Sequence, residues 1–538
     1  MQLTKIFKRF WTSTSIMLAG ASLLSRLLGL VRDRLLTHSF GATRVAGGIS
    51  ELDAYYAAFQ IPDLLYQILI MGTISACFVP YFTDLYKKHV RKDEAWQLAN
   101  NTLTSITLVI LVLILVSFVF TNQLVRIFTL GMSEESRALT VTLTRIMLLS
   151  PLFFSISAIT GAISHSLKRF VAFAVAPIFY NLAIIASIIF LKPTWGITGI
   201  SIGVVIGAVL HATIQLISAI KGGFRFSFLI DWQNQKFTQM VRSSIPRIMS
   251  LGVAQINIIS DTALASLLAV GSITIFTLAQ NIQSFPLGII GVSVAVASFP
   301  YMSELVIEKN YQKLGQFITE KIKKIIYILL PLTVISILLR TEITQLLFGS
   351  GRFNWTDTIN TANTFALFAI SFIFQSILPL LSRAFYAFKD TMTPFKVSCV
   401  SIAVHVAISI LLIVFFKGDV TMLAISFSIA SIFQTLFLLH RLQHNHPVQF
   451  TSSGLARFLV TSSGAALTTA LIGYACYIIV DTTVGPIDSI LKVAGKLVIV
   501  TILTGATYIG SQQLFGNHLT TMLGLNLHQK ETTNRLAD

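Results

Sequence analysis

Four charged side chains lie inside an apolar segment near the start of the chain. The stretch SRLLGLVRDR carries Arg26, Arg32, Asp33 and Arg34 among aliphatic residues. An arginine at the centre of a bilayer costs about 2.5–3.5 kcal/mol on insertion scales, so such a residue usually has a function. A guanidinium binds phosphate through two parallel hydrogen bonds, and this pairing is stronger away from water. The stretch therefore indicates a polar cavity that binds an anionic, phosphate-bearing group.

Arg26 and Arg32 are the strongest candidates for this cavity. Arg26 lies more than ten residues into its apolar segment, too far for its side chain to reach the membrane surface easily. Asp53 follows in the next apolar segment, where it could pair with one of the two arginines. The alternative, that these arginines only join helices or extend to the surface, stays open. It is the favoured interpretation for Arg34.

Charged residues also occur in apolar segments of the second half. Arg247 follows Pro246 at the start of one such segment, and a cavity role and a helix-end role are equally open for it. Asp261 lies in the middle of INIISDTALAS and is a candidate ion ligand or helix-pairing group. His405 is more typical of a hydrogen-bonded core histidine than of a proton relay.

No arrangement of residues indicates catalysis, and we expect neither an enzyme nor a cofactor. The chain has no phosphate-binding loop of the Walker type, no nucleophile elbow and no HExxH motif. Its three cysteines stand without the spacing of a metal site or a disulfide framework. We therefore predict no catalytic residues and no bound metal.

The elements that would position these residues are predicted to be membrane-spanning helices. Of 538 residues, 54% are hydrophobic and 11% are charged, whereas soluble domains carry about a quarter charged residues. The net charge of +17 is explained by Lys and Arg in cytoplasmic linkers rather than by nucleic-acid binding. We predict an all-α polytopic membrane protein with no nucleic-acid partner.

A span needs about 20 mostly apolar residues, and fourteen stretches are candidates. They are residues 14–40, 51–83, 99–121, 137–165, 171–192, 197–220, 243–270, 272–303, 321–341, 358–388, 394–416, 420–441, 456–480 and 488–514. Basic linkers follow alternate spans, for example at 87–92 and 309–324. By the positive-inside rule, we expect both termini on the cytoplasmic side of the membrane.

A weak internal repeat divides the chain into two halves. CFVPYFTDL at 77–85 and SFPYMSEL at 298–305 share a pattern at a separation of about 220 residues, and each ends the second span of its half. Transporters built from such repeats bind substrate where the halves meet. We predict two six-helix lobes plus two C-terminal helices: an N-terminal lobe at 1–220, a cytoplasmic connector at 221–242, a C-terminal lobe at 243–441, and two helices with a polar tail at 442–538.

Several stretches resemble the MurJ (MviN) family, the lipid II flippases of the multidrug/oligosaccharidyl-lipid/polysaccharide exporter superfamily. They occur in family order and read SRLLGLVRDRLLTHSFGA, LDAYYAAFQIPDLLYQIL, GTISACFVPYF, GAISHSLKRFVAFAVAPIFYN, SFPLGIIGVSVAVASFPYMS, LFGSGRFN and SRAFYAFKDTMTPFK. The resemblance implies fourteen spans and transfer of undecaprenyl-pyrophosphate-linked peptidoglycan precursor, lipid II, from the inner to the outer leaflet by alternating access. It implies lipid II and membrane lipids as partners, with cell-wall synthesis proteins as further candidates.

The resemblance places the family's cavity arginines on Arg26 and Arg32 and its acidic residue on Asp53. Two family arginines are replaced, by Tyr66 and Asn281. We hypothesise that Arg247 restores part of the missing positive charge.

Some members of the family bind sodium in the second lobe. Asp261 falls on one expected ligand, whereas His405 and Ser409 replace others.

We consider three functions for this protein. The first is a lipid II flippase, and the second is an exporter of another polyprenyl-linked oligosaccharide or of a cationic drug. Arginines in the cavity argue against a cationic substrate. The third is a scaffold that only recruits cell-wall assembly proteins, and the cost of arginines within the membrane argues against it.

Overall fold

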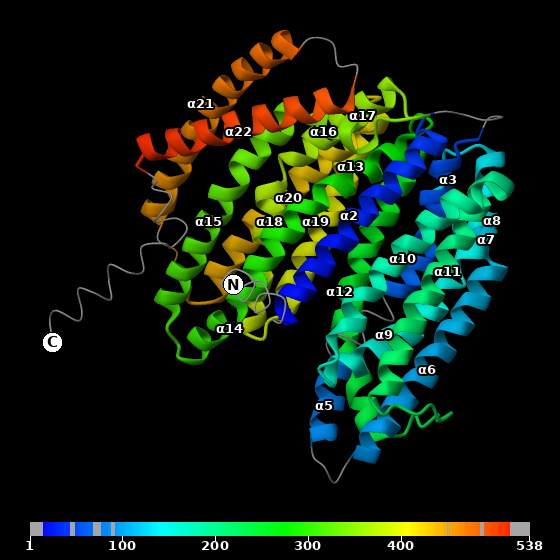
Figure 1. Cartoon of the computed structure of the whole chain (residues 1–538). Coiled ribbons are helices and arrows are strands. Elements are labelled where there is room, and N and C mark those ends of the chain that lie inside the picture. The colour runs from blue at the N-terminus through cyan, green and yellow to red at the C-terminus, as the bar shows by residue number, and fades with distance from the viewer. Residues whose placement is uncertain are drawn as a thin grey trace, which may run out of the picture. The chain divides into compact units, whose positions relative to one another are not determined.

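The computed structural model describes residues 14–43, 49–67, 77–87, 92–448, 450, 452–484 and 489–516. Within these ranges the side chains of a few helical residues, among them Pro246 and Arg247, lie outside the description. In the described residues, every secondary-structure element longer than one residue is a helix (Figure 1). The prediction of an all-α membrane protein is confirmed.

The chain divides into two compact units. The first unit comprises residues 1–274 and 350–354, and the second comprises residues 275–349 and 355–538. The first contains α2 (Thr14–Phe40), α3 (Glu51–Ala58), α4 (Gln60–Leu65), α5 (Val79–Lys87), α6 (Lys92–Val119), α7 (Thr121–Phe128), α8 (Glu134–Met147), α9 (Ser150–Ser166), α10 (Phe170–Phe190), α11 (Lys192–Lys221) and α12 (Gln235–Ser266).

The second unit holds most of α13 (Ser272–Pro286), which begins just before the division. It continues with the π-helix Leu287–Val292, α14 (Ser293–Ile307), α15 (Tyr311–Leu338), α16 (Arg340–Phe348), α17 (Trp355–Ala369), α18 (Phe372–Ala387), α19 (Met392–Ile410), the π-helix Leu411–Phe415, α20 (Thr421–Asn445), α21 (Ser452–Val484) and α22 (Ile490–Leu514). Helix α12 packs within the first unit, whereas the repeat in the sequence assigns that segment to the second lobe. The lobe boundaries stay a prediction.

Each of the fourteen predicted spans coincides with a helix or a run of helices, as far as the structure describes them. In the described residues, nine helices or continuous helical runs are long and apolar enough to cross a membrane. The number rises to eleven if two bent pairs each count as one span, α15 with α16 at 77° and α17 with α18 at 47°. The count of fourteen stays a prediction.

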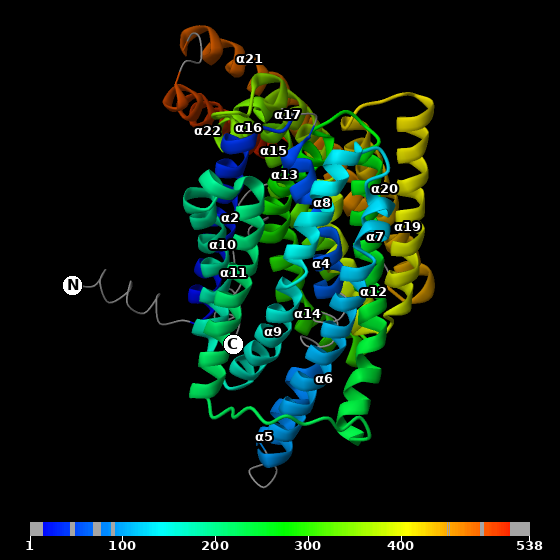
Figure 2. The same ribbon diagram turned by 90° about the vertical axis from the view of Figure 1, so that its right-hand side faces the viewer.

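Glycines bring α10 and α11 close together, and the two helices lie side by side (Figure 1 and Figure 2). A Cβ added at Gly203 would lie 2.1 Å from the Ser187 hydroxyl oxygen, and one at Gly207 would lie 2.8 Å from the Tyr180 ring. Small residues four positions apart allow close helix packing within membranes. This approach fixes Tyr180 and the face of α10 that carries the polar residues described below.

The segment that connects α11 to α12 is hydrogen-bonded to α6. Asn100 donates to the Arg225 carbonyl at 3.1 Å and accepts from the Ser227 amide at 2.9 Å. Asn101 makes the same pair of bonds with both backbone groups of Asp231, at 2.6 and 2.8 Å. The two asparagines thus satisfy backbone groups of an irregular segment that has no helical hydrogen bonds of its own.

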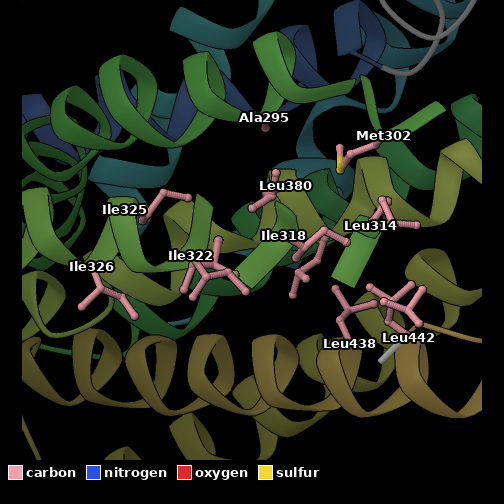
Figure 3. Close-up of a cluster of buried hydrophobic side chains, with 14 of the residues drawn as sticks. Ala295, Met302, Leu314, Ile318, Ile322, Ile325, Ile326, Leu380, Leu438 and Leu442 are labelled. Carbon is pink, nitrogen blue, oxygen red and sulfur yellow. The ribbon is translucent and has the colours of Figure 1, made fainter. Parts of the chain in front are cut away.

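The main apolar core of the second unit lies among α14, α15, α18 and α20. Figure 3 shows the isoleucines of α15 facing leucines of the neighbouring helices. Ile318, Ile325 and Leu380 are completely buried. Along α15, Leu314, Ile318, Ile322 and Ile325 are buried at intervals of four, four and three residues, which is typical of an amphipathic helix.

Candidate functional site

Arg32 is held on α2 by two polar partners within the first unit. Its Nη2 lies 2.8 Å from Asp33 Oδ1, and its Nε donates to the same oxygen at 3.0 Å. Its Nη1 donates to Asn181 Oδ1 on α10 at 3.3 Å. Asp33 is 2% exposed and Arg32 is 21% exposed. Arg32 therefore pairs with the adjacent Asp33, whereas Asp53, which the sequence offered as a partner for either Arg26 or Arg32, binds the groups described below.

Asn181 fixes the orientation of α2 against α10. Its amide nitrogen donates to the carbonyl and the hydroxyl oxygen of Ser25, at 3.2 and 3.3 Å. Ser25 and Arg32 are seven residues apart, which is about two helical turns, so they share a face. Asn181 is buried and bonds to both ends of this face. It is a positioning residue that sequence reasoning missed.

Arg26 lies on a different part of α2. Its side chain is exposed, as are Leu23, Leu24 and Leu27 around it. Arg34 is half-buried. Three arginines and one aspartate leave an excess of two positive charges on this helix.

Asp53 is buried on α3 and binds the first turn of α13 together with Gly271, the residue just before it. Its Oδ1 accepts from the amide and the hydroxyl of Thr274, at 2.8 and 2.6 Å. Its Oδ2 accepts from the Gly271 amide at 2.7 Å. Ser50 caps the helix by accepting from the Asp53 amide at 3.4 Å. The carboxylate thus closes a contact within the first unit between residues about 220 positions apart.

The two second-half candidates lie on α12. The side chain of Arg247 lies outside the described residues. Asp261 is 1% exposed, and its Oδ2 accepts from Asn257 at 3.3 Å. In the described part of the chain, no group of three or more His, Cys, Asp or Glu side chains could hold a metal ion. The ion-binding role of Asp261 stays a prediction.

A pocket of about 310 Å³ opens among α9, α10 and α11. We call it the α9–α11 pocket. Its walls include Tyr66, Phe154, Ser157, His211 and Gln215. Tyr66, which the resemblance places at the position of a family arginine, has its ring centroid 5.1 Å from that of Phe154. Sequence reasoning missed this pocket. The available signal was the pair His211 and Gln215, two polar residues four positions apart on the apolar helix α11.

A second set of buried charges lies in the second unit. Lys496 on α22 is 1% exposed, and its Nζ lies 2.7 Å from Glu342 Oε1 and 2.6 Å from Asp481 Oδ1. Tyr477 donates to Glu342 at 3.0 Å, and its ring lies beneath the ammonium group at 3.8 Å. These contacts join α21 and α22 to α16. Sequence reasoning missed this network because its members are far apart in the chain.

A smaller polar cluster lies between α18 and α19. The Asp390 carboxylate accepts from the amide and hydroxyl of Thr393, at 2.9 and 2.6 Å, and lies 3.5 Å from His446. Partial burial raises the pKa of Asp390, but the bonds from Thr393 and the contact with His446 outweigh it and leave the pKa below the usual value of a carboxyl group.

The sequence matches one protein family over most of its length. The family described as "Lipid II flippase MurJ" matches residues 38–495. The probable lipid II flippase MurJ of Thermotoga maritima is 30% identical over 72% of this chain and 76% of its own. The lipid II flippase MurJ of Burkholderia cenocepacia is 26% identical over 93% of this chain and 96% of its own.

Solved structures give the same result. A structure titled "Lipid II flippase MurJ, inward closed conformation" matches with a TM-score of 0.75 and 25% identity, over 92% of this chain and 98% of that one. An inward-facing multidrug-resistance MATE transporter of the MOP superfamily matches with a TM-score of 0.64 and 14% identity, over 78% of this chain and 94% of that one. The second likeness shows a shared fold alone.

Proposed function

This chain belongs to the lipid II flippase MurJ family, and on that premise we propose that it moves lipid II across the bacterial cytoplasmic membrane. The transfer runs from the inner to the outer leaflet, by alternating access of two lobes, and makes or breaks no covalent bond. The observation that carries the proposal is the family match, which spans residues 38–495.

The geometry of Arg32 supports an anionic substrate. A guanidinium has five N–H donors, and the contacts described here use three of them, with Asp33 and Asn181. The remaining two can donate to a pyrophosphate oxygen. Because Asp33 and Asn181 hold the guanidinium in place, less side-chain freedom is lost on binding than for an unrestrained arginine.

We assign substrate-binding roles to the residues predicted from the sequence. Arg26 and Arg32 contact the pyrophosphate, and Arg247 adds positive charge from α12. Asp53 shapes the site by holding the start of α13, as its bonds to Gly271 and Thr274 suggest. Asp261 remains the candidate ion ligand.

The predicted arrangement in the cell follows from the distribution of basic linkers. We propose that both termini lie in the cytoplasm, that residues 1–220 and 243–441 form the two lobes, and that 221–242 lies on the cytoplasmic surface. Cell-wall synthesis proteins are candidate partners, because they would consume the exported precursor.

The test is complementation of a bacterial strain depleted of its own lipid II flippase. Expression of this chain should restore growth, and lipid II should become accessible to reagents that reach only the outer leaflet. If growth returned without any change in leaflet accessibility, the scaffold interpretation would replace the flippase. If neither returned although the chain is inserted, an exporter of another polyprenyl-linked oligosaccharide would be the better candidate.

A further inference from the structure

The α9–α11 pocket contains a buried acceptor without a partner. Gln215 on α11 is 2% exposed, and within the described residues its Oε1 has no hydrogen-bond partner. Leaving a buried acceptor unsatisfied costs about 1–3 kcal/mol, and such groups are rare in native structures. A ligand that donates one hydrogen bond would satisfy this oxygen.

Gly161 keeps the amide of Gln215 at the wall of the pocket. A Cβ added at Gly161 would lie 3.2–3.4 Å from the three terminal atoms of the Gln215 side chain. That is tighter than an ordinary contact, so a larger residue there would displace the amide. Gly161 and Gln215 both line the pocket, so together they form one wall in which the glycine leaves room for the amide.

The chemistry of the other walls indicates a neutral ligand with an apolar face. None of the residues that line this pocket is Lys, Arg, Asp or Glu. The ring centroids of Phe154 and His211 lie 5.5 Å apart, and aromatic rings pack well against an apolar surface. Ser157 Oγ lies 2.6 Å from His211 Nδ1, so these two groups satisfy each other. A sugar ring fits these walls, because its C–H face is apolar and its hydroxyl groups donate hydrogen bonds.

The pocket is linked to Arg32 through neighbouring residues of α10. The Phe154 ring centroid is 5.5 Å from that of Tyr180, and the neighbouring Asn181 bonds to Arg32. Pro177, one turn before Asn181 on α10, lines the pocket, so a ring in the pocket and a pyrophosphate at Arg32 would both contact this part of α10. A pocket of about 310 Å³ is at the lower end of the range for small-molecule sites. It suits one part of a large substrate rather than the whole.

We propose that the α9–α11 pocket binds a sugar ring of the lipid-linked substrate through a hydroxyl that donates to Gln215. This inference rests on the proposed function, and it adds a site for the neutral glycan beside the site for the charged pyrophosphate. The pocket thereby distinguishes a lipid that carries sugar from the bare carrier lipid.

The experiment measures binding of three lipids to the purified full chain in detergent. The probes are undecaprenyl pyrophosphate, undecaprenyl-pyrophosphate-linked disaccharide, and the same lipid with its peptide. Gln215→Met removes the acceptor at similar volume, and Ala158→Phe fills the pocket. The control is Ile217→Met on the same helix, at a side chain that is 47% exposed.

We expect the original chain to bind the disaccharide lipid more tightly than the bare lipid. Gln215→Met should weaken binding of both sugar-bearing lipids about three- to tenfold, as the loss of one hydrogen bond does. Binding of the bare lipid should be unchanged. Ala158→Phe should abolish the preference for sugar, and Ile217→Met should behave like the original chain.

Three results would overturn the inference while leaving the proposed function intact. In the first, the original chain binds all three lipids equally. In the second, Gln215→Met and Ala158→Phe leave the preference for sugar unchanged. In the third, Gln215→Met weakens binding only when the peptide is present, which would assign the pocket to the peptide. If the original chain bound none of the three lipids, the proposed function itself would fail.

Discussion

Replacing Asp53 with asparagine should loosen the segment 271–274, which begins just before α13 and includes its first residues. The two carboxylate oxygens accept three hydrogen bonds, from the amides of Gly271 and Thr274 and from the Thr274 hydroxyl. In Asp53→Asn, one oxygen becomes an NH₂ group that can only donate. Whichever way the amide turns, it therefore faces one of these backbone N–H groups with a donor.

The structure gives the size of the effect. Asp53 is 5% exposed, so water replaces the lost bond poorly. A hydrogen bond to a charged group contributes about 1.5–3 kcal/mol. Since about 1.4 kcal/mol is a factor of ten, local opening of residues 271–274 should become roughly ten- to a hundredfold more frequent. Hydrogen–deuterium exchange followed by mass spectrometry measures this opening directly, through peptides that cover the Gly271 and Thr274 amides.

The matched control is Glu51→Gln, which removes a half-buried carboxylate from the same turn of α3. It should leave exchange at 271–274 unchanged. Equal exchange at these amides in Asp53→Asn and the original chain, with both proteins folded, would refute the reasoning. The bonds from Asp53 would then contribute little to the order of this segment.

Three further perturbations follow from the described contacts. Lys496→Met should lower the thermal unfolding temperature by several degrees, because it leaves the buried Glu342 charge without its cation; an unchanged temperature in detergent would contradict this. Gly203→Val should also destabilise the chain, since its Cβ would overlap the Ser187 hydroxyl, and a melting curve like that of the original chain would exclude the close packing. Because the pKa of Asp390 is lowered in the folded state, its contribution to stability is present above the unfolded pKa and is lost as pH falls through the folded one. Asp390→Asn should therefore be less stable than the original chain at pH 7, by a deficit that shrinks as the pH falls below the ordinary pKa of a carboxyl group; a deficit of the same size over the whole range would contradict the assignment.

The sequence predicted the helical elements well because the membrane imposes a simple length and polarity rule. All fourteen apolar stretches are helical where the structure describes them. Their breaks were less predictable. The single segment predicted at 358–388 is two helices bent by 47°, although its composition is apolar throughout. Hydropathy indicates whether a segment is more stable in lipid or in water, and it carries little information on where a helix bends.

The candidate site was predicted in part. The arginines of α2 stand out because charge is rare in apolar segments, but the sequence does not say which carboxylate pairs with which arginine. Arg32 pairs with the adjacent Asp33, whereas Asp53 binds backbone groups about 220 residues away. Such partners depend on tertiary packing, and no local pattern encodes them.

Polar residues without charge were the main omission. Asn181 and Gln215 lie within apolar helices and attract little notice by composition. Asn181 joins α2 to α10 through three hydrogen bonds, two that it donates to Ser25 and one that it accepts from Arg32. Amide side chains buried in membrane helices therefore merit the same attention as ionisable ones.

The most direct test of the account reconstitutes the purified chain into lipid vesicles that carry fluorescent lipid II in the inner leaflet only. The measurement is the rate at which the label becomes accessible to a membrane-impermeant quencher. We predict a faster rate than in vesicles that carry the labelled lipid but no protein. The double variant Arg26→Ala/Arg32→Ala, incorporated at the same density, should give the same rate as vesicles without protein. Equal rates for the double variant and the original chain would contradict the role of these arginines. Equal rates with and without the original chain would contradict the proposed function.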